Sequence, residues 1–183
     1  TAPAHLSGRA LQPLLRDRRV SNWRTFLPFI TTGAAPSIAC LQFAYRTEKF
    51  KLIISPPNQG ENLSAVAYLT DLNSFYIAGC KQHEIDASVP SIQEVYKIYK
   101  NPPGYELYDL EKDPNEFLNL AEDPEYKTIR FQLIKEFQKW QKSVDDPFFY
   151  DSNVRFWIKE QQRARGTNYK GVKNFRWGYL DEF

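Results

Sequence analysis

Few residues of this chain have the types and spacing that metal or nucleophile chemistry needs. Cys80 and His83 stand three positions apart, as one half of a zinc site would. Zinc takes four ligands, and the sequence holds no second pair of this kind, so we expect a small buried cysteine and a surface histidine. Asp145 and Asp146 suggest a cation site, but carboxylates between a helix and a proline are usually loop residues. His5 is expected to be solvated.

The composition is that of a globular protein rich in aromatic rings. Of the 183 residues, 42% are hydrophobic and 25% charged, which favours one compact domain with extensions. A net charge of +2 does not argue for a nucleic-acid or membrane partner, and no apolar run approaches the roughly 20 residues of a membrane span. Cys40 and Cys80 allow at most one disulfide. The chain lacks methionine and opens without a signal peptide, so we expect a processed product or a fragment.

The first half of the chain predicts a short helix followed by strands. Leu11, Leu14 and Leu15 share one helical face. β-branched and aromatic residues then predict strands at Trp23–Thr31, Ser37–Arg46 and Lys49–Ser55, the last two joined as a hairpin. The stretch from Leu63 to Lys100 is ambiguous up to a capping box at Ser91–Glu94, which predicts a short helix that stops at Asn101–Gly104.

The second half predicts one more strand and a long helix. Alternation in residues 105–110 suits an edge or final strand, Asp113-Pro114 makes a turn, and Asp123-Pro124 caps the helix that follows. The apolar stripe of this helix consists of Tyr126, Ile129, Leu133, Phe137, Trp140 and Val144. The prediction is therefore an α+β fold, a small four-stranded antiparallel sheet with a long helix packed on one face. The aromatic, mildly basic tail after Pro147 is expected to pack on something, such as a partner domain absent from this chain.

Three segments resemble the C-terminal region of sulfatases. "GYELYDLEKDPNEFLNLAEDP" is similar to the family pattern E-L-Y-D-L, D-P, E, N-L and P. "LSGRALQPLL" and "YRTEKFKLI" are similar to two further family segments and occur in the family order. The long spacer from Ile54 to Gly104 and "FQKWQKSVDDPF" resemble the sulfamidases (heparan N-sulfatases). The resemblance implies a C-terminal domain with a four-stranded sheet and a helix, attached to an alkaline-phosphatase-like catalytic domain outside this chain.

The family's chemistry is expected to lie in that other domain. The resemblance implies a parent enzyme with a formylglycine, made from Cys or Ser in C/S-x-P-x-R, and a calcium ion. Ser88-Val89-Pro90-Ser91-Ile92 comes near this motif, but Ile92 stands where arginine belongs, and we favour a helix start with Ser91 as cap. Cys40 and Cys80 have no proline two residues later. We therefore predict no catalytic and no metal-binding residue in this chain, which alone should be inactive.

Arg46 is the one candidate substrate contact. The family often has two arginines on the second strand that approach the active-site mouth, and here Phe43 stands at the first position and Arg46 at the second. Sulfamidases also have a histidine pair where this chain has Gly33 and Ala34. Both departures argue against a sulfamidase specificity, and a surface role for Arg46 in a hairpin remains the plainer interpretation.

The predicted organisation has three parts. Residues 1–22 form a linker with a short helix, residues 23–146 the sulfatase-like domain with an insertion at 54–104, and residues 147–183 an extension. The favoured function is the non-catalytic C-terminal domain of a sulfatase that acts on sulfated carbohydrate and is exported, as the family implies. One alternative is a free-standing carbohydrate-binding or interaction module. Another is the C-terminal part of a related phosphodiesterase or phosphonate hydrolase.

Overall fold

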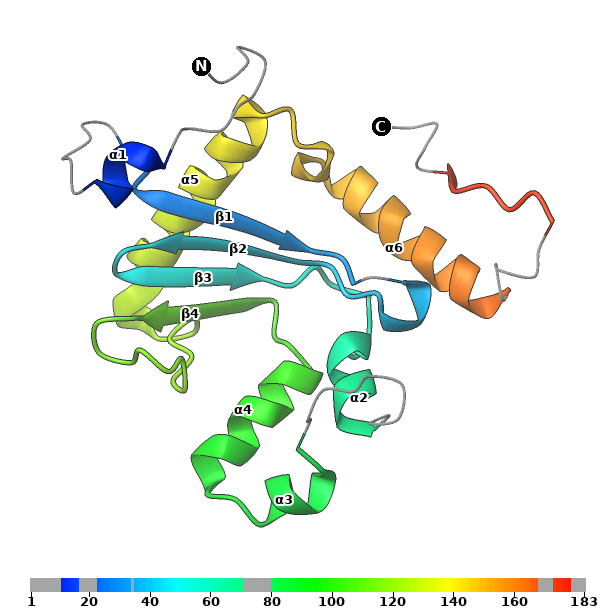
Figure 1. Cartoon of the computed structure of the whole chain (residues 1–183), viewed down its shortest axis with the longest axis horizontal. Helices are drawn as coiled ribbons and strands as arrows, with labels where there is room; N and C mark the ends of the chain where they lie inside the picture. The colour runs from blue at the N-terminus through cyan, green and yellow to red at the C-terminus, as the bar shows by residue number, and fades with distance from the viewer. Residues whose placement is uncertain (1–10, 17–22, 34, 71–79, 168–172, 179–183) are drawn as a thin grey trace.

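The computed structural model describes residues 11–16, 23–33, 35–70, 80–167 and 173–178 of the chain. It confirms an α+β fold built on one antiparallel sheet (Figure 1). The strands are β1 (Phe26–Thr31), β2 (Gln42–Thr47), β3 (Phe50–Ile54) and β4 (Tyr105–Asp109). The α-helices are α1 (Gln12–Leu15), α2 (Leu63–Thr70), α3 (Gln82–Asp86), α4 (Pro90–Lys100), α5 (Lys127–Ser143) and α6 (Asp151–Gly166). Short 3₁₀ turns are η1 (Pro36–Ile38), η2 (Pro124–Tyr126) and η3 (Pro147–Phe149).

The strands follow one another across the sheet in the order β1-β2-β3-β4. The predicted hairpin joins β2 to β3, and Thr47 closes it, because its hydroxyl accepts from the Phe50 N–H at 2.9 Å and donates to the Phe50 carbonyl at 3.2 Å. The second strand begins later than predicted. Pro36 starts the turn η1, and the β ladder forms only from Gln42 onward.

Helix α5 covers one face of the sheet and supplies the core (Figure 1). Phe43 and Tyr45 alternate inward from β2, and the centre of the Phe137 ring lies 5.8 Å and 6.2 Å from the centres of their rings. Burial raises the pKa of Tyr45 to about 12, and its hydroxyl donates to Glu136 at 3.3 Å. The predicted stripe is wrong at its last member, because α5 ends at Ser143 and Val144 is 51% exposed.

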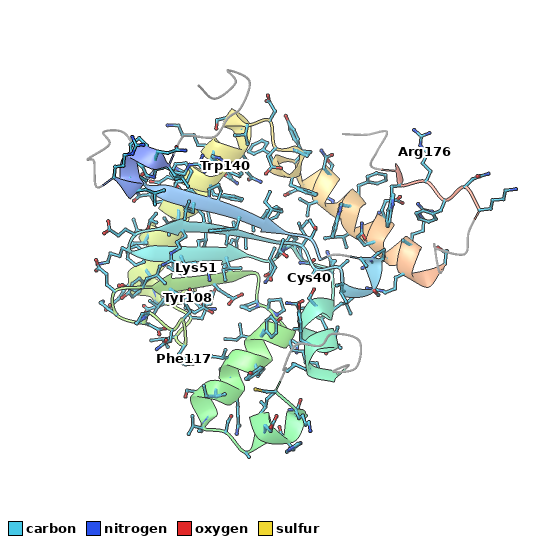
Figure 2. The ribbon with its side chains drawn as sticks, in the orientation of Figure 1. Cys40, Lys51, Tyr108, Phe117, Trp140 and Arg176 are labelled. Atoms are coloured by element: carbon cyan, nitrogen blue, oxygen red, sulfur yellow. The ribbon has the colours of Figure 1, made fainter. Side chains whose placement is uncertain are left out.

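Helix α6 shows what the aromatic tail packs on. Val154, Trp157 and Ile158 are buried in the same core cluster as the sheet and α5. Residues 173–178 lie along α6, where the Gly178 N–H donates to Glu160 at 2.7 Å and Arg163 donates to the Arg176 carbonyl at 3.0 Å (Figure 2). The described part of the tail thus packs on this chain itself.

The segment between β3 and β4 forms the helices α2, α3 and α4, which extend from one end of the sheet (Figure 1). The predicted capping box is wrong. Val89 is the N-cap of α4 and Pro90 its first residue, so Ser91 already lies inside the helix. Proline has a preset φ and needs no N–H partner at the first helical position, which moves the start of the helix forward. Among the described helices none is both long and apolar enough to cross a membrane.

Candidate functional site

The face of the sheet that α5 leaves uncovered is the first candidate surface. Side chains of a strand alternate between the two faces of the sheet, so the neighbours of each residue that points toward α5 point to the uncovered face. The register of the four strands shows which of these residues lie side by side. We call this surface the open face and define it by Leu27, Phe29, Ala44, Arg46, Lys51, Ile53, Glu106 and Tyr108. In Figure 1 α5 lies behind the sheet, so the open face is turned toward the viewer.

Arg46 lies in the middle of the open face, as a residue of β2. Its Cα partners are Leu27 on β1 and Lys51 on β3. The side chain is exposed, and its guanidinium has no hydrogen bond or ion pair with any residue the structure describes. Leu27 and Phe29, beside it on β1, are 50% and 52% exposed. The open face therefore combines a free positive charge with an apolar strip.

The β4 side of the open face is closed by a polar network. Lys51 Nζ lies 2.5 Å from Glu116 Oε2, so its charge is paired, whereas Arg46 has no ion-pair partner among the described residues. Tyr108 donates its hydroxyl to the buried Glu106 carboxylate at 2.6 Å. Burial raises the pKa of Glu106, and burial together with this bond raises the pKa of Tyr108. Figure 2 shows Lys51 and Tyr108 on neighbouring strands, with Phe117 in the loop that follows β4.

The structure does not bring the other candidate residues together. His83 is exposed on α3, and Cys80 is half-buried and accepts the Tyr96 hydroxyl at 3.0 Å. Asp146 caps η3, accepting from the Phe148 N–H at 3.0 Å and from the Gln141 side chain at 2.9 Å. In the described part of the chain, no three His, Cys, Asp or Glu residues cluster as a metal site would. These residues therefore do not fit the calcium that the resemblance implies for the parent enzyme.

The remaining nucleophile candidates have structural surroundings. The Ser88 hydroxyl donates to the Ile85 carbonyl at 2.6 Å, at the junction between α3 and α4. Cys40 is a buried free thiol, and burial raises its pKa to about 11, so it stays protonated near neutral pH. His5 and Ala34 lie outside the described residues. Gly33, the other position of the family's histidine pair, has a φ of +74°.

The structure adds a cleft of about 680 Å³ that the sequence did not indicate. It opens on the other side of the sheet from Arg46, because Phe43 and Ile54 line it from the α5 face. Its walls come from α5, η3, the start of α6 and the loop that follows β3. These segments are distant in sequence, so only a knowledge of the fold could have grouped them.

Comparison with known proteins gives two partial sequence matches. A family model described as N-sulphoglucosamine sulphohydrolase, C-terminal, matches residues 74–143. An ulvan-active sulfatase from Formosa agariphila is 47% identical over 55 residues, which is 30% of this chain and 11% of that protein. Both matches support the sulfatase C-terminal domain that the resemblance predicted.

Solved structures share the fold of this chain. A candidate sulfatase from Bacteroides thetaiotaomicron matches 81% of the chain with a TM-score of 0.52 and 18% identity. A 2-O GAG sulfatase matches the same share with a TM-score of 0.51 and 18% identity. The chain covers 22% of each of these structures. It thus spans about a fifth of their length.

Proposed function

We propose that this chain is the non-catalytic C-terminal domain of a sulfatase that acts on sulfated carbohydrate. The observation that carries the proposal is the open face. It combines the exposed apolar strip of Leu27 and Phe29 with Arg46, which has no charge partner among the described residues, on a chain whose sequence matches support a sulfatase C-terminal domain. An exposed apolar strip with a cation beside it suits a surface that packs on a larger domain and contacts an anionic substrate.

The partner in this proposal is the catalytic domain of the same sulfatase. Helix α1 adds to the apolar surface, since Leu11, Leu14 and Leu15 are all exposed. Packing on the catalytic domain would remove these side chains and the strip on β1 from water, which stabilises the contact through the hydrophobic effect. The formylglycine and calcium are proposed to belong to that domain.

The proposed substrate is a sulfated sugar, whose sulfate ester or sulfamate the parent enzyme hydrolyses to inorganic sulfate. A sulfamate on glucosamine nitrogen has support from the matched family model. Gly33 argues against a sulfamate substrate, because the resemblance places a histidine at this position. We therefore propose only the substrate class, which is sulfated carbohydrate.

The test is an Arg46→Ala substitution in the complete sulfatase, measured as kcat/KM on a sulfated disaccharide. The substitution removes the guanidinium that would bind an anionic group of the substrate, so kcat/KM should fall about tenfold or more. Lys139→Ala is the matched control, because Lys139 is an exposed cation on α5, on the other side of the sheet. An unchanged kcat/KM for Arg46→Ala would remove Arg46 from the substrate site.

A further inference from the structure

We propose that the cleft beside α5 and α6 binds a saccharide unit that carries an anionic group, either sulfate or carboxylate. The cleft has a volume of about 680 Å³, within the roughly 300–1,000 Å³ of small-ligand sites. This site is separate from Arg46, which lies on the opposite face of the sheet. The inference concerns binding alone and requires no hydrolysis.

One wall of the cleft is held in place by hydrogen bonds to main-chain groups. The Gln59 side chain bonds twice to Leu41, accepting from its N–H at 2.8 Å and donating to its carbonyl at 2.7 Å. The Asn58 carbonyl accepts from the Gln162 side chain at 3.2 Å, and the Ser55 N–H donates to the Gly104 carbonyl at 3.0 Å. A wall fixed before the ligand arrives lowers the entropy lost on binding.

The inner surface of the cleft is aromatic and apolar. Phe137 and Val154 are buried at its base, and the rings of Tyr105 and Phe149 remain partly exposed among its lining residues. The face of an aromatic ring is electron-rich and attracts polarised C–H groups. The ring face of a sugar presents such C–H groups. Arg130 lies over one face of Tyr105 and Lys142 over one face of Phe149, so each ring would stack on a pyranose through its other face.

The lining includes four polar side chains that have no side-chain partner in the described part of the chain. Asn58, Gln138, Asp151 and Arg155 make no side-chain hydrogen bond or ion pair with any described residue. Together they offer amide donors and acceptors, a carboxylate acceptor and a guanidinium donor. A ligand with adjacent hydroxyl groups needs both kinds of group within a short distance, and a sugar is such a ligand.

The charges around the cleft favour an anionic sugar over a neutral or cationic one. Arg155 can donate two parallel hydrogen bonds to a sulfate or carboxylate. Lys142 adds a second cation nearby, with its Nζ 4.8 Å from the centre of the Phe149 ring. Asp151 also lines the cleft, and the lining Gln141 donates to the Asp146 carboxylate, so the preference for an anion rests on the guanidinium of Arg155 and not on a net charge of the site.

The experiment is an NMR titration of the full 183-residue chain with defined saccharides. The probes are a sulfated disaccharide, a uronate-containing disaccharide, a neutral disaccharide and sodium sulfate. We expect saturable binding of the two anionic disaccharides, with amide shifts at Gly104, Tyr105 and Gln138. Sodium sulfate and the neutral disaccharide should each bind at least about tenfold more weakly, since each lacks half of the contacts.

Two variants and a control assign the site. Arg155→Gln should weaken the binding of the anionic disaccharides about tenfold or more and leave the binding of the neutral one unchanged. Tyr105→Ala should weaken the binding of every disaccharide. Lys159→Gln is the control, because Lys159 is an exposed cation of the same helix outside the cleft. The wild-type shift map gives the location even if a variant folds poorly.

Three results would overturn the inference: no saturable binding of any disaccharide, sodium sulfate binding as tightly as the sulfated disaccharide, or equal effects of Arg155→Gln and Lys159→Gln. The second result would indicate a simple anion site. A failure here leaves the proposed sulfatase function standing, because Arg46 is tested on the other face by kcat/KM.

Discussion

Gly33 follows β1 and has a φ of +74°, in a region that residues with a side chain rarely adopt. A Cβ atom at this position would lie 2.3 Å from the Ile38 carbonyl oxygen and 2.9 Å from Ala39 Cα. Both contacts are with main chain, which cannot swing aside as a flexible side chain would. The backbone of this turn therefore excludes the histidine that the sulfamidase resemblance would place there.

Alanine substitution should lower the free energy of unfolding by different amounts at Gly33, Gly60 and Gly104. Gly33→Ala combines a left-handed φ with a clash and should lower the free energy of unfolding by about 3 kcal/mol or more. Gly60→Ala has a φ of +80° but open space, so only the conformational cost of about 1 kcal/mol is expected. Gly104 has no left-handed φ and no atom that a Cβ would meet, so Gly104→Ala should change the free energy of unfolding little. Urea unfolding followed by circular dichroism gives the three values, and equal losses at Gly33 and Gly104 would contradict the described turn.

Glu106 should make the fold less stable as the pH rises. Burial raises its pKa above the ordinary 4.5, so the folded state keeps a proton that the unfolded state has lost. Its stabilising contribution is complete below the unfolded pKa and is lost as the pH rises through the folded pKa. Glu106→Gln should therefore flatten the fall in unfolding free energy as the pH rises above the ordinary carboxyl pKa of 4.5.

The matched control for Glu106 is Glu94→Gln, at an exposed position of α4. This variant should retain the pH dependence of the wild type. Unfolding by urea at a series of pH values measures both. A Glu106→Gln profile that parallels the wild type would show that Glu106 titrates normally in the fold.

At the scale of the elements, the helix caps separate what the sequence predicted correctly from what it did not. Asp123 is a cap, as its position before Pro124 indicated, but it caps η2, which leads into α5, and not α5 itself. Its side chain accepts from the Glu125 N–H at 2.9 Å, and the N-cap of α5 is Tyr126. Asp123→Ala should cost about 1 kcal/mol of unfolding free energy. Ser91→Ala should cost less than about 0.5 kcal/mol, because Ser91 lies inside α4 and caps nothing. Thermal unfolding of both variants checks this, and a larger loss at Ser91 would restore the capping box.

Helix α5 was predictable and α6 was not, for a physical reason. The buried side of α5 repeats apolar residues at helical spacing from Ile129 to Trp140. The buried side of α6 includes Glu160 and Gln161, so its apolar stripe is interrupted. Glu160 is buried because Arg163 and the Gly178 N–H satisfy its carboxylate, a partnership that becomes visible only in the fold.

The packing of α6 gives the next prediction. Trp157 is buried in the shared core, and the centre of its ring lies 6.3 Å from that of Phe148. Trp157→Ala should lower the free energy of unfolding by about 3–5 kcal/mol, the usual range for a large buried ring. Phe131→Ala is the control, since Phe131 is 59% exposed on α5. If urea unfolding gives equal losses for the two variants, α6 contributes no core to the domain.

At the scale of the whole molecule, the fold could be predicted because its elements are local in sequence. The alternation in residues 105–110, the turn at Asp113-Pro114 and the stripe of α5 each lie within a few helical turns or one strand. The cleft could not be predicted, because it joins Phe43 and Asn58 to Arg155 across more than half of the chain. The open face lies between these cases. The sequence singled out Arg46, but its neighbours on the sheet, and the absence of a charge partner among the described residues, became visible only in the fold.

The central claim is that this domain supports a reaction centre located elsewhere in a sulfatase. The most direct measurement is sulfate release from a sulfated disaccharide, by the purified chain and by the complete sulfatase under the same conditions. We predict sulfate from the complete enzyme and none above background from the chain. Release of sulfate by the purified chain itself would contradict the account.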